Sequence, residues 1–202
     1  MAGGPAISRF PVPELDGLPA DLKERIDAVR AKTGFVPNVF LVMARRPDEF
    51  RAFFAYYDAL MLREGGLSKA EKEMVVVVTS AANQCPYCVV AHGALVRLFT
   101  KDPRLGDELA INYRQAEVGP RQRTMLDAAL KLATSPQTFG DADVQRLLAH
   151  GFSREDVWDI GAITGLFALS NRLAHLADMR PNEEFFTLGR GAQPSSSSTR
   201  TS

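Results

Sequence analysis

The segment from Gln84 to Gly93 reads Gln-Cys-Pro-Tyr-Cys-Val-Val-Ala-His-Gly and holds both cysteines of the chain and one of its three histidines. On one helix, a rise of about 1.5 Å and a turn of about 100° per residue would separate the Cα atoms of Cys85 and Cys88 by about 5 Å. That separation is compatible with a disulfide. His92 would follow Cys88 by one turn on the same face, where an imidazole can take the thiol proton and leave a reactive thiolate. The spacing therefore predicts a nucleophile, a resolving thiol and a base at one site.

The residues alone do not decide which cysteine attacks. The N-terminus of a helix favours a thiolate at Cys85, whereas the histidine favours one at Cys88. Two other interpretations of the motif are a pair of buried small residues and a zinc site in which Glu73 joins Cys85, Cys88 and His92. Haem attachment is excluded because Val89, and not a histidine, follows Cys88.

Composition limits the class of protein. The chain has 202 residues, 46% of them hydrophobic, and 24 basic residues balance 24 acidic ones. This predicts one globular domain without a basic surface for nucleic acid, so small or neutral partners fit better. No apolar run reaches the roughly 18 residues of a membrane helix, and the first ten residues lack the charged and apolar regions of a signal peptide. Two cysteines cannot form a secreted disulfide framework, so we expect a cytoplasmic protein.

Apolar residues recur at helical spacing along most of the chain, and no convincing strand remains. Residues 1–20 are rich in proline and predict an extended arm on the surface, residues 21–188 a helical domain, and residues 189–202 a disordered tail. The expected helices begin near Asp21 and then cover about 47–64, 68–82, 86–99, 107–115, 121–134, 141–150 and 157–176.

One of these helices carries a carboxylate in apolar surroundings. Val75 to Val78 favour a strand locally, but Ser68 and Glu71 form a capping box pattern and the segment ends in alanines, which favours a buried helix. Glu73 lies among these residues, so its side chain should be partly dry. A carboxylate there would either have a raised pKa or hold a partner such as His92.

Glu73, Cys85, Cys88 and His92, at these spacings in an all-helical frame, resemble the alkylhydroperoxidase AhpD-like family of the carboxymuconolactone decarboxylase superfamily. The Gly-Phe-Val-Pro-Asn element at residues 34–38 resembles the peroxidase-related branch, which carries a long N-terminal extension. The core motif covers about residues 50–118, and looser similarity covers roughly 7–188. The resemblance implies an all-α, single-domain homo-oligomer.

The resemblance further implies a thiol-dependent peroxidase that reduces hydrogen peroxide or organic hydroperoxides. Cys88 would be the peroxidatic cysteine and become a sulfenic acid, Cys85 would resolve it to a disulfide, and an external dithiol or thiol protein would reduce the site again. His92 would act as the base, and Glu73 would orient it and relay protons. No cofactor or metal is implied. One departure is Tyr87, because well-studied relatives carry a second histidine between the cysteines, and a phenol is a poor proton shuttle at neutral pH.

Other readings use the same residues or other polar ones. The main alternative is a non-catalytic, redox-sensing or zinc-binding helical protein, and a weaker one is a decarboxylase-like enzyme of the superfamily. His150 lies at a predicted helix end, where a structural role is expected. Asn171, Arg172 and His175 lie where the last long helix should end, so we expect capping and surface contacts, or support of the site or of a subunit interface.

Overall fold

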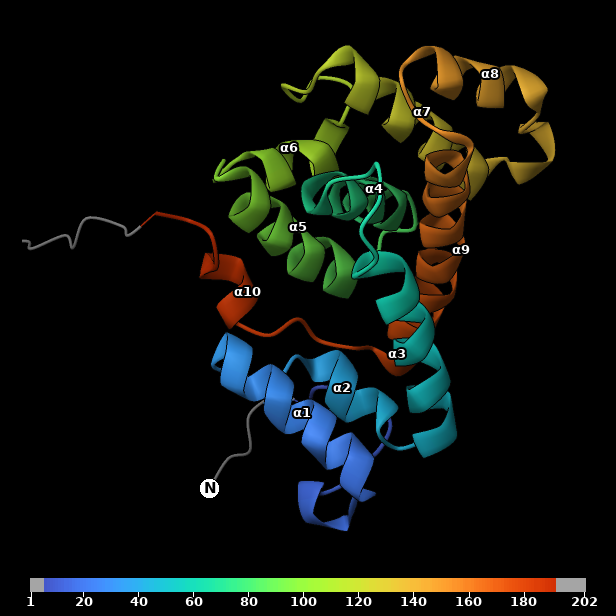
Figure 1. The fold of residues 1–202 in the computed structure, drawn as a ribbon. Helices are drawn as coiled ribbons and strands as arrows, with labels where there is room; N and C mark the ends of the chain where they lie inside the picture. Colours follow the sequence, from blue (N-terminus) through green and yellow to red (C-terminus); the bar gives the residue numbers. More distant parts are fainter. Residues whose placement is uncertain (1–5, 192–202) are drawn as a thin grey trace, which may run out of the picture.

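The computed structural model describes residues 6–191, and within them the chain forms α-helices and two short 3₁₀ segments but no strand (Figure 1). This confirms the predicted all-α class. The helices are α1 (Ala20–Thr33), α2 (Asn38–Met43), α3 (Pro47–Met61), α4 (Lys69–Ala82), α5 (Pro86–Thr100), α6 (Leu105–Asn112), α7 (Pro120–Thr134), α8 (Asp141–Ala149), α9 (Arg154–Ala177) and α10 (Glu184–Thr187). In this part of the chain, no helix combines the length and the apolar character needed to cross a membrane.

Helix α4 lies at the centre of the fold, packed against α5, α6, α7 and α9 (Figure 1). Its N-terminus carries the predicted capping box, in which the Ser68 side chain accepts from the Glu71 backbone and the Glu71 side chain accepts from the Ser68 backbone. Val75 to Val78 are almost completely buried. The valine run is helical because the cap starts the helix and neighbours bury it on every side.

Three charged residues of α4, Glu71, Lys72 and Glu73, are also buried, and each has partners. Lys72 donates from Nζ to the carbonyl oxygens of Leu60 and Arg63, both at 2.7 Å. These carbonyls belong to the C-terminal end of α3 and the loop behind it, where helical carbonyls lack partners. Burial lowers the pKa of Lys72. Lys72 therefore ties α3 to the central helix, and its neighbour Glu73 points to a different partner, described below.

The N-terminal arm packs along the end of α9. The backbone N–H of Arg9 donates to the carbonyl of Ala177 (2.6 Å), and that of Arg180 donates to the carbonyl of Ile7 (3.1 Å). A 3₁₀ segment, Leu15–Gly17, precedes α1. Residues 1–5 of the predicted arm and residues 192–202 of the predicted tail lie outside the described residues, and the three-part division of the chain stays a prediction.

Two short helices, α2 and α10, were not predicted. Neither is long enough to show a 3.6-residue period, and contacts from distant residues hold them. The Asn38 side chain donates to the carbonyl of Arg180 (2.8 Å), and the Asn182 side chain accepts from the Asn38 backbone (2.7 Å). The Phe35 ring meets that of Phe185 edge to face. The segment at 34–38 is thereby pinned to the chain that follows α9.

Candidate active site

The cysteine motif begins at the corner between α4 and α5. Gln84 turns the chain with a φ of 52°, and Cys85 then adopts an extended conformation as the N-cap of α5. The backbone N–H of Cys85 donates to the carbonyl of Ser80 in α4 (3.0 Å), and Pro86 is the first helical residue. This corner places Cys85 at the N-terminus of α5 and Cys88 in its first turn, with both side chains buried.

The two thiols perturb each other. A hydrogen bond from the Cys88 thiol lowers the pKa of Cys85 to about 6, and the nearby side chains of His175 and His92 act in the same direction. The same hydrogen bond, together with burial, raises the pKa of Cys88. The Cys88 sulfur also lies 3.8 Å from the hydroxyl oxygen of Ser170 in α9. In the reduced protein the negative charge therefore favours Cys85, which is the direction that the helix N-terminus also favours.

Glu73 and His92 form a buried pair. His92 Nδ1 lies 2.6 Å from Glu73 Oε2, and both side chains are nearly inaccessible. Since an ionised carboxylate only accepts hydrogen bonds, Nδ1 carries the proton and Nε2 of the neutral ring keeps its lone pair. The His92 ring packs edge to face on Phe167, with the ring centres 4.7 Å apart. Glu73 therefore fixes both the tautomer and the orientation of the imidazole.

Cys88 and His92 line one cavity of about 170 Å³. Among residues 6–191 no hydrogen bond joins His92 to Cys88, so a proton that passes between them must cross this cavity. Its wall is mostly apolar and comes from α1, α2, α3, α5, α9 and α10 and from Pro37 between α1 and α2. The lining residues are Thr33, Pro37, Val39, Phe40, Phe53, Phe54, Tyr57, Tyr87, Cys88, Ala91, His92, Leu95, Phe167, Ser170 and Phe185.

Tyr57 brings a hydroxyl group to the apolar wall of this cavity. Burial raises the pKa of Tyr57, and the charge of Glu73 adds to the increase. The phenol therefore stays protonated and is available as a hydrogen-bond donor. Tyr57 was not predicted as a site residue because it lies in the apolar stripe of α3, where an aromatic residue predicts core packing.

Polar residues of α9 form hydrogen bonds with the corner between α4 and α5. Asn171 donates from Nδ2 to the Ser80 hydroxyl (3.0 Å) and accepts from Asn83 Nδ2 (2.9 Å). His175 Nε2 lies 2.9 Å from the carbonyl oxygen of Asn83. The expectation that Asn171 caps a helix end or contacts the surface is wrong, because α9 continues to Ala177 and only 1% of Asn171 is exposed. In the sequence, the signal for this contact is the polar pair Ser170–Asn171 within a mostly apolar helix.

The remaining polar candidates have local contacts. Tyr87 is buried, and its hydroxyl accepts a hydrogen bond from the Val39 backbone (3.1 Å), so it holds α2 against the site. His150 ends α8 and lies 2.8 Å through Nδ1 from the Arg146 carbonyl. Arg172 is exposed and binds the carbonyl of Ala168 in its own helix. These contacts match structural roles for Tyr87, His150 and Arg172.

The side chains that could bind a metal do not come together at one site. Within the described part of the chain, no three His, Cys, Asp or Glu side chains come together as a metal site would require. The four residues of the motif are instead arranged as a Cys–Cys pair and a Glu–His pair. This arrangement suits proton transfer and thiol chemistry better than tetrahedral zinc.

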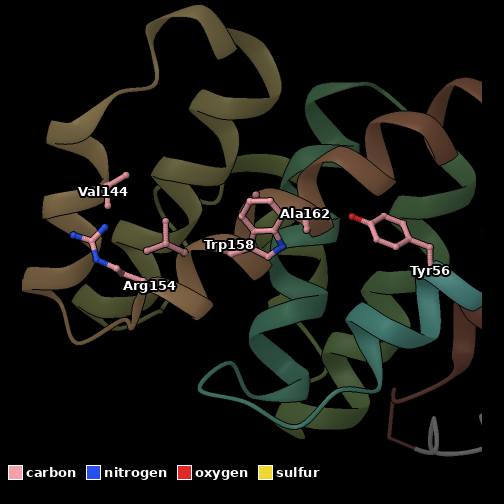
Figure 2. Close-up of a pocket in the computed structure, with 7 residues that line it drawn as sticks. Tyr56, Val144, Arg154, Trp158 and Ala162 are labelled. Atoms are coloured by element: carbon pink, nitrogen blue, oxygen red, sulfur yellow. The ribbon is translucent and has the colours of Figure 1, made fainter.

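A larger hollow, of about 460 Å³, lies on another surface. Figure 2 shows Tyr56 from α3 on one side of it and Trp158 and Ala162 from α9 beside it, with Val144 of α8 and Arg154 at the other end. Its lining includes no cysteine, histidine or carboxylate. The hollow therefore offers a surface for contact and not a second centre of thiol chemistry.

Comparison with known proteins agrees with the fold and with the family that the sequence resembles. Residues 47–130 match the carboxymuconolactone decarboxylase family. A crystal structure of an alkylhydroperoxidase AhpD core, an uncharacterized peroxidase-related protein from Ralstonia eutropha JMP134, is 58% identical, with a TM-score of 0.92 over 94% of this chain and 100% of that one. A peroxidase-related protein from Silicibacter sp. TM1040 is 41% identical, with a TM-score of 0.88 and the same coverage.

More distant structures share the fold alone. The debrominase Bmp8 is 18% identical, with a TM-score of 0.70 over 91% of this chain and 95% of that one. No curated protein matches the chain. The identity and coverage of the two peroxidase-related proteins decide the relationship, and the chain belongs to the AhpD-like, peroxidase-related branch of the carboxymuconolactone decarboxylase family.

Proposed function

We propose that this protein is a dithiol peroxidase that reduces organic hydroperoxides, with Cys88 as the peroxidatic and Cys85 as the resolving cysteine. The observation that carries the proposal is the buried Glu73–His92 pair, whose imidazole lines the same cavity as Cys88 while Cys88 interacts with Cys85. A base of fixed tautomer, a nucleophile and a second thiol are the groups that such a cycle needs.

In the oxidative half of the cycle, the Cys88 thiol loses its proton and its sulfur attacks one peroxide oxygen. His92 Nε2 accepts this proton and returns it to the departing alkoxide, while Glu73 stabilises the imidazolium that forms in between. Tyr57 donates a hydrogen bond to the departing oxygen. The O–O bond breaks, Cys88 becomes a sulfenic acid, and an alcohol leaves.

The Cys85 thiolate then attacks the sulfenic sulfur of Cys88. A disulfide forms and hydroxide leaves, taking a proton from solvent to become water, so the peroxide has received two electrons from the two cysteines. In the reduced protein the hydrogen bond from the Cys88 thiol lowers the pKa of Cys85 to about 6, so the resolving cysteine is predisposed to ionise before the cycle begins. An external thiol reductant restores both thiols.

The cavity in front of Cys88 favours apolar substrates. Aromatic rings from α2, α3, α5 and α9, together with Phe185 of α10, form much of its wall. Burying a hydrocarbon group against such a wall is favourable by roughly 25 cal/mol per Å² of apolar surface, a contribution that hydrogen peroxide cannot obtain. We therefore propose organic hydroperoxides as the preferred substrate class.

The test is anaerobic turnover with a small dithiol and either cumene hydroperoxide or hydrogen peroxide, together with measurement of zinc content. We expect catalytic consumption of the organic hydroperoxide, a higher kcat/KM for it than for hydrogen peroxide, and far less than one zinc per chain. A protein that forms the disulfide once but does not turn over would support the redox-sensing alternative. Stoichiometric zinc, with stability lost on chelation, would support the zinc-binding one.

We further propose that two copies associate through the outer face of α9. Exposed or half-exposed residues recur there at alternating spacings of four and three, as in a helix–helix seam, and they are Trp158, Ala162, Gly165, Leu169, Arg172 and Leu176. In an antiparallel pair with its two-fold axis near Gly165, Leu169 of one copy would face Ala162 of the other, and Trp158 would face Arg172. The face is therefore complementary to itself in size and charge.

Light scattering tests the association. We expect a dimer or a larger even oligomer that Leu169→Glu converts to monomers. Leu62→Glu alters a leucine outside α9 that is more exposed than Leu169, and it should have no effect. A monomeric wild-type protein would contradict this proposal.

A further inference from the structure

The short helix α10 forms one side of the Cys88 cavity. It spans only Glu184–Thr187, which is too short to be stable as an isolated helix. It packs against α5 (Figure 1), and it carries Phe185, whose buried side chain lines the cavity. The contacts that hold α10 on α5 therefore determine the position of this wall.

A buried arginine of α5 holds α10 in place. Arg97 lies on the same helix as Cys88, and only 3% of it is exposed. Its Nε donates to the carbonyl oxygen of Leu188 (2.9 Å), and its Nη2 donates to that of Phe185 (2.7 Å). These carbonyls lie at the end of α10, where a helix leaves its carbonyls without partners. The planar guanidinium group can bind both at once, whereas an ammonium group has no such fork.

An ion pair and a close backbone approach extend this contact beyond α10. Asp107 of α6 lies 3.6 Å from Arg97 and also binds Arg190 (2.8 Å). Gly189 has a φ of 76°, and a Cβ at this position would lie 2.8 Å from the Cβ of Arg97. The position therefore favours glycine. Residues 184–190 form a strap that is fastened to α5 and α6.

The strap also contacts the segment at the mouth of the cavity. Among the residues that line the cavity, Thr33 is the exposed one, so the mouth lies beside the C-terminal end of α1. Phe35 follows Thr33 closely in the chain, and its ring meets the ring of Phe185 edge to face, with the ring centres 5.1 Å apart. Phe185 therefore borders the cavity near its mouth and is held from two sides.

We propose that Phe185 limits the size of the organic hydroperoxide that reaches Cys88, and that Arg97 is the residue that positions Phe185. The inference rests on the proposed peroxidase function and names its substrate class, which is hydroperoxides of a single ring or a short alkyl group. The cavity has a volume of about 170 Å³. Since an apolar cavity of about 150 Å³ binds benzene, one ring nearly fills it. A second ring would have to displace Phe185.

The experiment compares two peroxides that differ by one ring. Cumene hydroperoxide carries one phenyl group, and its analogue with phenyl in place of one methyl group carries two. In the wild-type protein, kcat/KM for the analogue should be lower by roughly 10- to 10²-fold, because the second ring overfills the cavity. Phe185→Ala makes room for this ring and should remove most of the difference. Phe185→Leu keeps more of the packing, which guards against unfolding, and should remove part of it.

The role of Arg97 is tested through the same ratio of kcat/KM values, which a general loss of stability would not change. Arg97→Lys keeps the charge but loses the fork, and Gly189→Ala pushes the strap away from α5 without altering Arg97. Both should narrow the ratio, by less than Phe185→Ala does. Gly151→Ala is the control, because Gly151 also has a positive φ (82°) but has open space around an added Cβ. A wild-type ratio in both Arg97→Lys and Gly189→Ala would overturn the role of Arg97.

Binding of the product alcohols separates this inference from the peroxidase function, because it needs no thiol chemistry. In titration calorimetry, the wild-type protein should bind cumyl alcohol at least about tenfold more tightly than the alcohol with two rings, and Phe185→Ala should bind both similarly. This result without peroxide turnover would remove the peroxidase function and leave the size limit intact. Turnover with the same preference in wild type, Phe185→Ala and Phe185→Leu would overturn the size limit and leave the function intact. Neither turnover nor binding would overturn both.

Discussion

The two sides of the α4–α5 corner differ in almost every physical property. On the Cys88 side, aromatic rings enclose a carboxylate–imidazole pair whose members are buried. On the Cys85 side lies a smaller cavity of about 120 Å³, whose lining includes the exposed side chains of His175, Asp178 and Arg180. Proton transfer in apolar surroundings benefits from a fixed donor and acceptor, whereas exchange with an external thiol needs access. The two cysteines therefore line environments that differ in polarity and exposure.

The largest effect on peroxide consumption should come from replacing each of the two cysteines by serine in turn. Cys88→Ser removes the proposed nucleophile and should reduce peroxide consumption to background. Cys85→Ser should keep one rapid turnover and accumulate a sulfenic acid on Cys88, because no second thiol condenses with it. Dimedone labelling with peptide mass spectrometry measures both outcomes.

Because the pKa of Cys85 is lowered, the alternative assignment, with Cys85 as the peroxidatic cysteine, must be tested directly. If the label appeared on Cys85 in the Cys88→Ser protein, and Cys85→Ser were inert, the roles of the two sides would be exchanged. The polar cavity would then admit the peroxide, and the apolar one would need another substrate.

The imidazole on the Cys88 side should have the next largest effect. His92→Ala removes the proton acceptor and should slow single-turnover oxidation by about 10² to 10⁴-fold. Loss of the buried Glu73 partner also affects stability, so oxidation is compared at a temperature at which circular dichroism shows both proteins to be folded. An unchanged oxidation rate would mean that the cavity, and not the base, determines reactivity.

A third prediction concerns the charge shared by the sulfurs. Because the folded protein lowers the pKa of Cys85 to about 6, its thiolate forms as pH rises through that value and should be present at neutral pH. Cys88→Ala removes the thiol that donates to Cys85, so the midpoint of Cys85 alkylation should move upward toward about 8.5, with about 30-fold slower alkylation at pH 7. Iodoacetamide labelling from pH 5 to pH 10 measures the shift. An unchanged midpoint would indicate that the helix N-terminus and the histidines, and not Cys88, stabilise the thiolate.

The corner between α4 and α5 could be predicted from the sequence because it depends on the spacing of residues that are close in the chain. Pro86 and the Ser68–Glu71 box place two helix starts, and the positions of both cysteines relative to them follow from helical geometry. The burial of Glu73 follows from the apolar residues around it. The all-α class, the central valine-rich helix and the family relationship could all be predicted on this basis.

The cavities could not be predicted, because their walls come from segments far apart in the chain. Phe40 and Phe185 belong to short helices that only tertiary contacts hold, and both line the Cys88 cavity. Asn171 and His175 meet Asn83 across almost 90 residues, a contact that no local pattern specifies. Local residues thus indicated which groups could react, whereas tertiary packing determines what surrounds each sulfur.

Glu73→Gln should have a smaller effect than the loss of His92. The glutamine carbonyl can still accept the proton of His92 Nδ1 and keep the tautomer, but it no longer stabilises an imidazolium. We expect oxidation to slow by about tenfold, toward the lower end of the range for positioned acid–base groups. Single-turnover oxidation measured across pH, with His150→Gln as a control, tests this order. A larger defect than that of His92→Ala would mean that Glu73 transfers protons by a route that bypasses the imidazole.

The smallest effect should be on the choice of peroxide, and it tests the apolar character of the Cys88 side directly. Leu95 lies one turn beyond His92, is half-buried and lines the cavity. Leu95→Gln replaces apolar surface with an amide, so kcat/KM for cumene hydroperoxide should fall about fivefold, less than the roughly tenfold or more that a fully enclosed methylene provides. The value for hydrogen peroxide should stay the same because it has no hydrocarbon to bury. Leu98→Gln alters an exposed leucine of the same helix outside the cavity and should leave both values unchanged. If Leu95→Gln lowered both values equally, the cavity would act on the thiol chemistry and not on the substrate, and the preference for organic hydroperoxides would have to arise elsewhere.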